Sequence, residues 1–445
     1  MTLRAGFASA VITPPVGVLL EGYSSNTEPS AGVHDDLHAR ALVLDDGATA
    51  VAIVSCDLIG VDRRLVANAR QLASEATGLP REHILIAGTH THQGPAGLRR
   101  GGDDALLDVT ARKIAGAITE AHAARREAVL KIGTGTVDSV AMNRRHPDWP
   151  VDTSLTVLLL DGTDPLQPPI AAAINYSCHP TVLYSDNHLI SADYPGHVVR
   201  TVEALFPGAG ALFLNGACGN VNPVWIKQTH EEAERVGRIV GAAAARIVGE
   251  LRPLGTGQVA HNIRWDEHIE LPVACGELVE DVRLCAASRV IELPVKSFLP
   301  QEEYESTVRE LEARASAPAA DREEHRRVMA QLTRLRTEQQ VALRMASREG
   351  TTIHPELQAI GLAPGVALLG LPGEFFVETV AEIREGAGLR HLPVACYANN
   401  YIGYVVPAPA YDEGGYEAGV TLLAPEAEAI VKREALAVLG EVVSA

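Results

Sequence analysis

The sequence predicts an α/β fold with a mixed β-sheet core flanked by helices, on three observations. Short apolar runs typical of buried strands alternate with amphipathic helical segments. The order strand, helix, strand recurs three times, at about residues 50–87, 170–214 and 366–397. A polar side chain stands where strands of each unit end, and ligands of open α/β sheets collect at the carboxyl ends of strands. We therefore predict one shared site at these strand ends.

The first unit begins with a predicted hairpin of strands at residues 39–44 and 50–55, with Asp57 at its end. Apolar spacing predicts a helix over 63–77, which Gly78 stops. A buried strand at 84–87 then leads into Gly88-Thr-His-Thr-His-Gln-Gly-Pro95. Because alternate strand residues share a face, we expect His90 and His92 to point to the same side. Residues 2–25 hold a strand-like run at 8–13, followed by Pro14-Pro15 and a Gly-rich turn, and this opening is expected to be irregular and to lie over the core.

The second and third units repeat this pattern. Strands at 170–177 and 211–214 flank a helix at about 195–206, and Cys178-His179-Pro180 follows the first strand. A strand at 366–369 leads to Pro372-Gly-Glu374, followed by a helix at about 375–385 and a strand at 393–397. The residues expected to share one site are Asp57, His90, His179, Glu374 and Tyr404. In the alternative interpretation, such residues are helix caps and turn formers, as Asp57 could be.

The remaining segments predict helices around the sheet. Amphipathic patterns predict helices at 110–126 and 231–251 that cover it. The charge-dense stretch 301–348, broken by small residues at 316–320, predicts an antiparallel helical hairpin inserted into a single domain that spans 1–445. A lid, an oligomer contact and a solvated structural arm all fit this hairpin.

Composition excludes several classes of protein. The chain has 38 Lys and Arg against 56 Asp and Glu, a net charge of -18, so a nucleic-acid partner is not expected. It has no apolar run near the ~20 residues of a membrane span and no sign of a secretory leader, so we expect a cytoplasmic protein without membrane insertion. A homo-oligomer stays open. Six cysteines without a C-x-x-C pattern indicate reduced thiols, so a metal would need His and oxygen ligands.

Residue chemistry points to a metal hydrolase. The chain has no H-E-x-x-H helix, G-x-S-x-G turn or phosphate loop at a suitable place. His90, His179 and Glu374 could hold a divalent metal with one position left for water, and zinc held in this way lowers the pKa of its water to ~7. Further polar candidates for the rim of the site are His34, His38, Asp193 and His197.

Five motifs in this order resemble the catalytic domain of neutral/alkaline non-lysosomal ceramidases. They are the G-T-H-T-H-x-G-P run, His-Pro-Thr at 179–181, Gly-Asn-Val-Asn-Pro at 219–223, Pro-Gly-Glu at 372–374, and the spacing from Tyr404 to Tyr416-Glu417. The resemblance runs from about residue 5 to 419. It implies a zinc ion held by His90, His179, Glu374 and Tyr404. It also implies that Tyr416, His92 near the substrate amide, and Arg144, with Arg145 as the uncertain neighbour, are active-site residues.

Three departures from the family pattern change the expected substrate. Asn222 stands where the family has an active-site serine, so a serine nucleophile is not available. We also expect neither the C-terminal immunoglobulin-like domain nor the secretory signal that are typical of ceramidases. We therefore expect a soluble or modest-sized N-acyl substrate, with long-chain ceramide in a membrane a poor one.

The predicted function is zinc-dependent hydrolysis of an amide bond. His92 would transfer protons, and Tyr416 or Arg144 would help to hold the oxyanion. An esterase or lactonase of the same fold would need the same metal and water. A non-catalytic metal-binding protein is the alternative from a different class.

Overall fold

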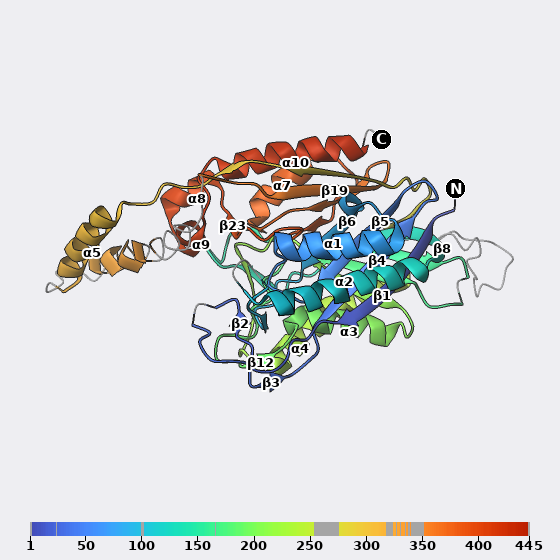
Figure 1. Ribbon diagram of the computed structural model, residues 1–445, viewed down its shortest axis with the longest axis horizontal. Coiled ribbons are helices and arrows are strands. Elements are labelled where there is room, and N and C mark those ends of the chain that lie inside the picture. Colours follow the sequence, from blue (N-terminus) through green and yellow to red (C-terminus); the bar gives the residue numbers. More distant parts are fainter. Residues whose placement is uncertain are drawn as a thin grey trace.

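The computed structural model describes most of the chain, and the statements below concern that part. The described residues are 2–98, 102–252, 276–316, 324–339 and 351–443, apart from residues 24, 165, 326, 330, 334, 337 and 338. Helices cover the outer faces of two stacked β-sheets (Figure 1). The predicted α/β class, with a mixed sheet core flanked by helices, is confirmed.

The larger sheet has nine strands and mixes parallel and antiparallel pairs. Its order is β13-β11-β10-β8-β1-β4-β5-β6, with β15 also paired to β8. The strands are β1 (Arg4–Val11), β4 (His38–Asp45), β5 (Ala50–Cys56), β6 (Ile84–Gly88), β8 (Arg126–Thr136), β10 (Ser154–Gly162), β11 (Ala171–Tyr176), β13 (Gly210–Asn215) and β15 (Gly276–Val279).

A second, four-stranded sheet packs against one face of the first and was not predicted. Its order is β16 (Cys285–Val290), β19 (Glu356–Ala363), β20 (Val366–Gly370) and β22 (Val394–Ala395). Ile360 and Leu368 of this sheet share a buried cluster with Leu42 and Leu158 of the larger sheet. Burial of both faces explains why strands of both sheets read as continuous apolar runs.

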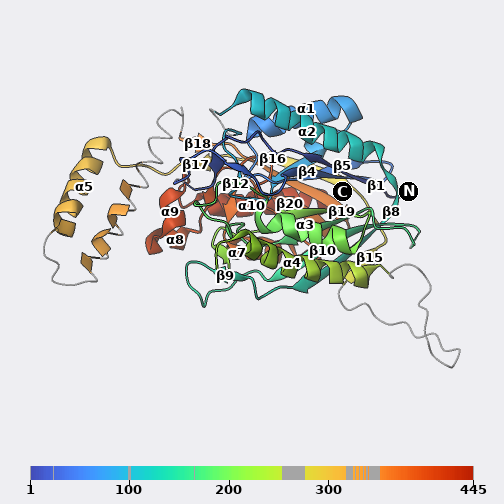
Figure 2. The ribbon, with the colours of Figure 1, turned by 90° about the horizontal axis from the view of Figure 1, so that it is seen from below.

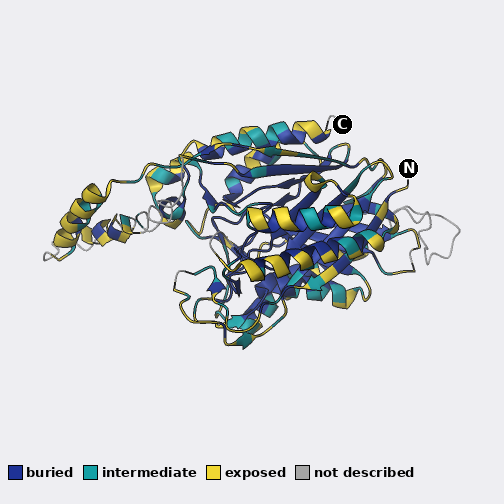
Figure 3. Ribbon diagram, viewed as in Figure 1, coloured by how far each residue is buried: buried dark blue, intermediate teal, exposed yellow. Residues whose placement is uncertain are grey.

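Helices close the two outer faces, with their exposed sides turned to solvent (Figure 3). On the larger sheet, α1 (Arg63–Thr77) and α2 (Asp104–Ala123) cover one half. Helices α3 (Asp193–Leu205) and α4 (His230–Leu251) cover the other half. Helices α7 (Val377–Ala387) and α10 (Ala427–Val443) cover the smaller sheet.

The three predicted units appear as three copies of one arrangement. Each is an antiparallel strand pair followed by a helix and a strand parallel to the second, namely β4-β5-α1-β6, β10-β11-α3-β13 and β19-β20-α7-β22. A parallel neighbour needs a crossover connection, which the helix supplies. Each unit therefore directs its strand ends toward the same region of the molecule.

Helix α1 shows how the local sequence sets these boundaries. The Asp62 side chain accepts a hydrogen bond from Arg64 N (2.7 Å) at the start, and Gly78 adopts φ 78° at the end. Leu65 and Ala69 on one face are buried. The predicted helix, residues 63–77, agrees with the structure at both ends. The prediction for α2 was less accurate, because this helix starts at Asp104, where Asp103 caps it, rather than at residue 110.

The expectation of an irregular opening was wrong for its first part. The strand-like run at 8–13 overlaps a longer strand, β1, which is central in the sheet and pairs with β4 from Arg4↔Asp45 to Val11↔His38. The small residues of its first half hid the strand pattern but serve packing, because a Cβ at Gly6 would lie 2.1 Å from the carbonyl oxygen of Ala121 in α2. The strand is thus built for the close approach of a helix.

The charge-dense segment forms an arm that projects from the layered body (Figure 2). We call arm the helix α5 (Gln301–Ser316) together with the described helical residues between 324 and 339. Leu311, Val328 and Leu332 form its own small buried cluster. α5 ends at Ser316, where the break was predicted to begin, while residues 317–323 and 340–348 of the predicted hairpin lie outside the described residues.

The structure also bears on membrane-spanning helices and on the cysteines. Among the described helices, none combines the length and the apolar character that crossing a bilayer requires. Cys56, Cys178, Cys218, Cys285 and Cys396 are free thiols, and Cys275 lies outside the described residues.

Candidate metal centre

The loop after β6 delivers two histidines, by a different route from the one predicted. The strand ends at Gly88, and His90 has a backbone φ of 72°, a left-handed conformation that is uncommon for a residue other than glycine. Strand alternation therefore does not place His90 and His92 on one side. The turn brings the two side chains together, and the His90 ring stacks on the Tyr397 ring with their centroids 3.9 Å apart. Strained backbone of this kind is often found at functional sites.

Hydrogen bonds fix the protons of two imidazoles. Nδ1 of His90 lies 2.5 Å from the carbonyl oxygen of Ile59, and Nδ1 of His179 lies 3.0 Å from that of Cys218. A carbonyl oxygen only accepts, so each Nδ1 carries a proton, and each ring in its neutral form presents a lone pair at Nε2. These two Nε2 atoms are 3.0 Å apart. In the neutral form that binds metal, the two lone pairs face each other, a contact that a bound cation would resolve.

A carboxylate completes the cluster. Glu374, in the short strand β21 (Glu374–Phe375), has its Oε2 3.4 Å from Nε2 of His90 and 3.6 Å from Nε2 of His179. This buried Oε2 accepts no hydrogen bond within the described structure, whereas Oε1 accepts one from the Tyr401 hydroxyl. Burial raises the pKa of Glu374, but His90 and the hydroxyls of Tyr401 and Tyr404 outweigh it and lower the pKa to about 2. The carboxylate is therefore ionised at neutral pH.

His92 faces the same cluster from the other side. Its Nε2 lies 3.3 Å from Nε2 of His90, and its buried Nδ1 has no hydrogen-bond partner in the part of the chain that the structure describes. Gly22 and Tyr23 hold the ring, since a Cβ at Gly22 would lie 2.6 Å from its Nδ1 and the Tyr23 ring packs at 4.8 Å. Burial, reinforced by His90, lowers the pKa of His92 and of His179 well below the usual value. Both rings are neutral at pH 7, the form that binds metal.

Arg144 joins Tyr404 to the rest of the site. Its Nη2 donates to the Tyr404 hydroxyl (3.0 Å) and to the carbonyl oxygen of Gly219 (2.6 Å), and its Nε donates to Glu417 (2.7 Å). Arg145 turns away and donates to Glu413 and Glu417, both at 2.9 Å. Of the two arginines, Arg144 is thus the one that contacts a predicted ligand.

Asn222 and Tyr416 border Arg144. Asn222 lies in β14 (Val221–Pro223), which pairs with β9 (Ala141–Asn143), and its Oδ1 accepts a long hydrogen bond from Nη1 of Arg144 (3.4 Å). The Tyr416 ring meets that of Tyr404 edge-on at 5.9 Å and is 61% exposed. All eight residues predicted for the site therefore belong to one connected cluster: His90, His92, Arg144, His179, Asn222, Glu374, Tyr404 and Tyr416.

Other candidates do not join this cluster. Asp57, expected in the shared site, accepts hydrogen bonds from Arg40 Nη1 (2.6 Å) and His38 N (2.9 Å), because the neighbouring strand β4 places both beside it. Asp57 and Arg40 thus form a buried structural ion pair. His34, His38 and His197 line a separate cavity of about 400 Å³. Asp193 is buried at the start of α3 and accepts hydrogen bonds from backbone N–H groups, including that of Leu183 (3.0 Å).

Sequence reasoning assigned no role to Tyr401, whose hydroxyl donates to Glu374. The available signal was its place three residues before Tyr404 in the same aromatic run. Hydrogen bonds that orient a ligand typically change metal affinity about 10- to 100-fold. We expect Tyr401→Phe to weaken metal binding by such a factor in a chelator competition titration. Tyr411→Phe, which loses a hydrogen bond to Leu423 O instead, is the matched control. Equal affinity in Tyr401→Phe and wild type would contradict this role.

The donor set suits a metal ion. Ligand atoms of His90, His92 and His179 all lie within 4.8 Å of one another, in a fully buried group. The unpartnered Oε2 of Glu374 faces two of them. Neutral imidazoles and an ionised carboxylate that converge in this way can hold a divalent cation.

Comparison with known proteins shows what the chain resembles. Residues 4–211 match the sequence model of neutral/alkaline non-lysosomal ceramidase, N-terminal. The neutral ceramidase of Pseudomonas aeruginosa is 25% identical over 481 aligned residues, which cover 96% of this chain and 70% of that protein. The chain is thus similar to neutral/alkaline non-lysosomal ceramidases. The neutral ceramidase of Mycobacterium tuberculosis is 24% identical over 475 residues, covering 90% of this chain and 71% of the relative.

Solved structures of ceramidases share the fold. The crystal structure of neutral ceramidase from Pseudomonas aeruginosa superposes with a TM-score of 0.76 at 20% identity, covering 100% of this chain and 75% of that one. A ceramidase complexed with C2 gives a TM-score of 0.73 at 19% identity, covering 99% and 75%. The expected resemblance is thus confirmed for family and fold.

Proposed function

We propose that this ceramidase-like chain is a zinc-dependent hydrolase that cleaves the amide bond of an N-acyl compound. Similarity to neutral ceramidases supports the hydrolase class. The observation that carries the metal is the 3.0 Å contact between Nε2 of His90 and Nε2 of His179, whose protons are on Nδ1. Two imidazoles with a carboxylate are ligands that zinc prefers in catalytic sites.

The proposed ligands are His90, His179, Glu374 and the hydroxyl of Tyr404. Burial raises the pKa of Tyr404 well above its usual value, while the Arg144 guanidinium acts in the opposite direction. Arg144 thereby favours the phenolate form that a ligand role would require. A zinc ion bound here would polarise the amide carbonyl and lower the pKa of a water molecule to ~7.

His92 is suited to proton transfer. It is neutral at pH 7 because burial lowers its pKa, and its Nε2 faces the ligand cluster. In this role Nε2 accepts the proton of the attacking water and then returns it to the leaving amine nitrogen. Gly22 and Tyr23 keep the ring in place without a hydrogen bond to Nδ1 in the described structure.

Arg144 supplies positive charge beside the reacting carbonyl. Glu417 holds its Nε, and the Tyr404 hydroxyl holds its Nη2, so the guanidinium is fixed before substrate arrives. A positioned cation stabilises negative charge that develops on the carbonyl oxygen. The exposed Tyr416 ring, 5.8 Å from the Arg144 guanidinium carbon, lies where substrate would pass.

Asn222 bears on substrate choice. It replaces the family serine with an amide, which offers both a donor and an acceptor, and it contacts Arg144. A buried polar group built for one partner can reject an analogue that lacks this partner by up to ~10⁴-fold. Asn222→Ser is therefore expected to shift preference between amides that differ in the amine part.

The proposal is tested with a panel of short N-acyl amides, matched esters and ceramide, before and after metal removal. We expect amide hydrolysis that falls on the order of 10²-fold or more on chelation and returns with zinc, because the metal supplies several kcal/mol of transition-state stabilisation. Esters hydrolysed in place of amides would favour the esterase alternative. Full activity in metal-free protein, or no hydrolysis of any panel member, would refute the proposal.

A further inference from the structure

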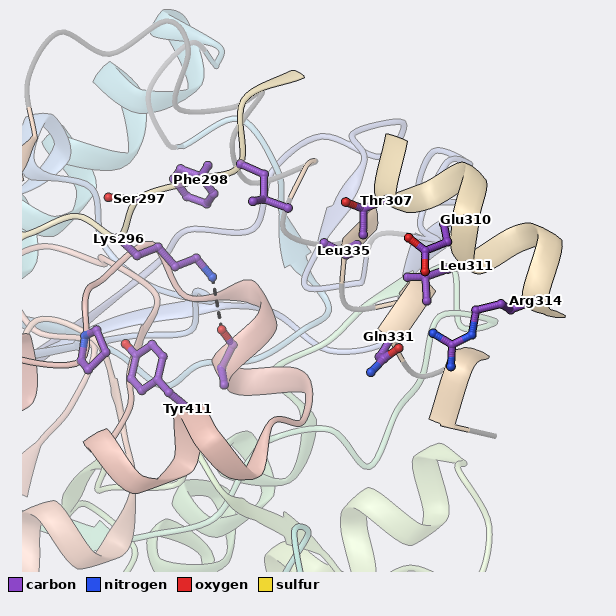
Figure 4. Close-up of a pocket in the computed structure, with 13 residues that line it drawn as sticks. Lys296, Ser297, Phe298, Thr307, Glu310, Leu311, Arg314, Gln331, Leu335 and Tyr411 are labelled. Carbon is purple, nitrogen blue, oxygen red and sulfur yellow. Dashed lines mark hydrogen bonds between the residues drawn. The ribbon is translucent and has the colours of Figure 1, made fainter. Parts of the chain in front are cut away.

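A groove separates the arm from the body of the molecule (Figure 4). It lies against α8 (Ala408–Glu413) and α9 (Tyr416–Val420) and has a volume of about 680 Å³, within the range of small-molecule pockets. The apolar side chains that line it come from the arm, the body and the segment between them. They include Phe298, Leu299, Leu311, Leu335, Tyr411 and Ala418.

Several polar side chains on the walls are already engaged with the protein, while Ser297, Glu310 and Gln331 also line the groove. Lys296 Nζ donates to the carbonyl oxygens of Ala418 (3.2 Å) and Gly419 (3.1 Å). The Tyr411 hydroxyl donates to Leu423 O (2.8 Å), and Arg314 pairs with Glu324 at 2.5 Å. A polar ligand would have to displace these bonds, whereas a hydrocarbon chain gains by covering Leu299, which is 39% exposed.

One short helix joins the groove to the candidate metal centre. In α9, Glu417 accepts a hydrogen bond from Arg144, while the next residue, Ala418, lines the groove. Tyr416, at the start of the same helix, contacts Tyr404 and is exposed. An extended substrate with its amide at the metal centre can therefore pass Tyr416 and reach the groove.

We propose, building on the function above, that the groove binds the hydrocarbon tail of the N-acyl substrate and that the arm thereby selects for chain length. The walls supply apolar surface for the tail, and the bonds that Lys296, Tyr411 and Arg314 make within the protein keep these three polar groups from competing for it. Burying one methylene improves binding about 4-fold. Selectivity for longer chains then arises far from the reacting atoms.

The test measures kcat/KM for amides of one amine with acyl chains from butanoyl to hexadecanoyl. In wild type we expect kcat/KM to rise with chain length, by about 4-fold for each methylene that enters the groove. Leu299→Asn should flatten this rise and leave the butanoyl amide unchanged. Met329→Asn, exposed on the arm but not lining the groove, is the matched control and should keep the wild-type profile. Equal loss on short and long amides, or an unchanged profile in Leu299→Asn, would overturn the proposal.

A binding measurement separates this proposal from the proposed function. Dansyl-labelled dodecanoic acid reports binding by fluorescence without turnover. We expect it to bind wild type and Met329→Asn alike and to bind Leu299→Asn at least several-fold more weakly. This result would support the groove even if no amide were hydrolysed. Equal binding to all three proteins would reject the groove whatever the activity.

Discussion

Replacing His90 or His179 with alanine is expected to remove the bound metal and to lower kcat/KM on the order of 10³-fold. Each substitution takes away one of the two Nε2 atoms that face each other at 3.0 Å, which leaves the proposed set of ligands with a single imidazole beside Glu374 and Tyr404. A catalytic metal contributes several kcal/mol of transition-state stabilisation, and about 1.4 kcal/mol corresponds to tenfold in rate. Elemental analysis and steady-state kinetics measure the two effects.

The matched control is His83→Ala. Nδ1 of His83 also pairs with a backbone carbonyl, that of Ala50 (3.0 Å), but this histidine precedes β6 and lies at the opposite end of the strand from His90. We expect His83→Ala to keep metal and activity. Full metal content in both His90→Ala and His179→Ala would show that the ligands are elsewhere.

His92→Ala is expected to keep its metal and to lose on the order of 10²-fold or more in kcat. The proposed ligand set does not require His92, whereas a general acid and base contributes about 10²- to 10⁴-fold. Gly22→Ala provides a second variant, which retains the His92 side chain but disturbs its position. Its new Cβ would stand 2.6 Å from Nδ1 of His92, so the ring must move and kcat should fall in the same direction.

Metal content distinguishes two roles for His92. Its donor atom lies within 4.8 Å of those of His90 and His179, so the geometry also allows a third imidazole ligand. If His92→Ala loses metal in proportion to activity, His92 is a ligand and the proton-transfer role is wrong. A variant that keeps both metal and kcat would exclude both roles.

The parts of the fold that local patterns control were predictable. The boundaries of α1 follow from Asp62, Gly78 and the apolar spacing between them. The repeated unit follows from apolar runs alternating with helical segments. The first half of β1 was missed because its small residues, such as Gly6, serve contact with α2 rather than a strand pattern. The stacking of two sheets depends on contacts between distant segments, which periodicity does not report.

For the site as well, motifs were predictable from the sequence, whereas contacts between distant segments were not. Motif order placed eight residues in one cluster, but the reason given for His90 and His92 was wrong, because a left-handed turn at His90 replaces strand alternation. Asp57 was misassigned, since only the fold shows Arg40 beside it. Tyr401 was missed because its role lies in one hydrogen bond to Glu374. The cytoplasmic location and a homo-oligomer stay predictions from the sequence.

X-ray absorption at the zinc edge, on protein purified with its native metal, tests the central claim most directly. The account predicts one zinc per chain with imidazole and oxygen ligands at about 2.0–2.2 Å. Cys178 precedes His179, and Cys218 provides the carbonyl oxygen that His179 Nδ1 contacts, yet both are buried thiols whose pKa burial raises, so they should not contribute. Absence of zinc from active protein, or a sulfur ligand at about 2.3 Å, would contradict the account.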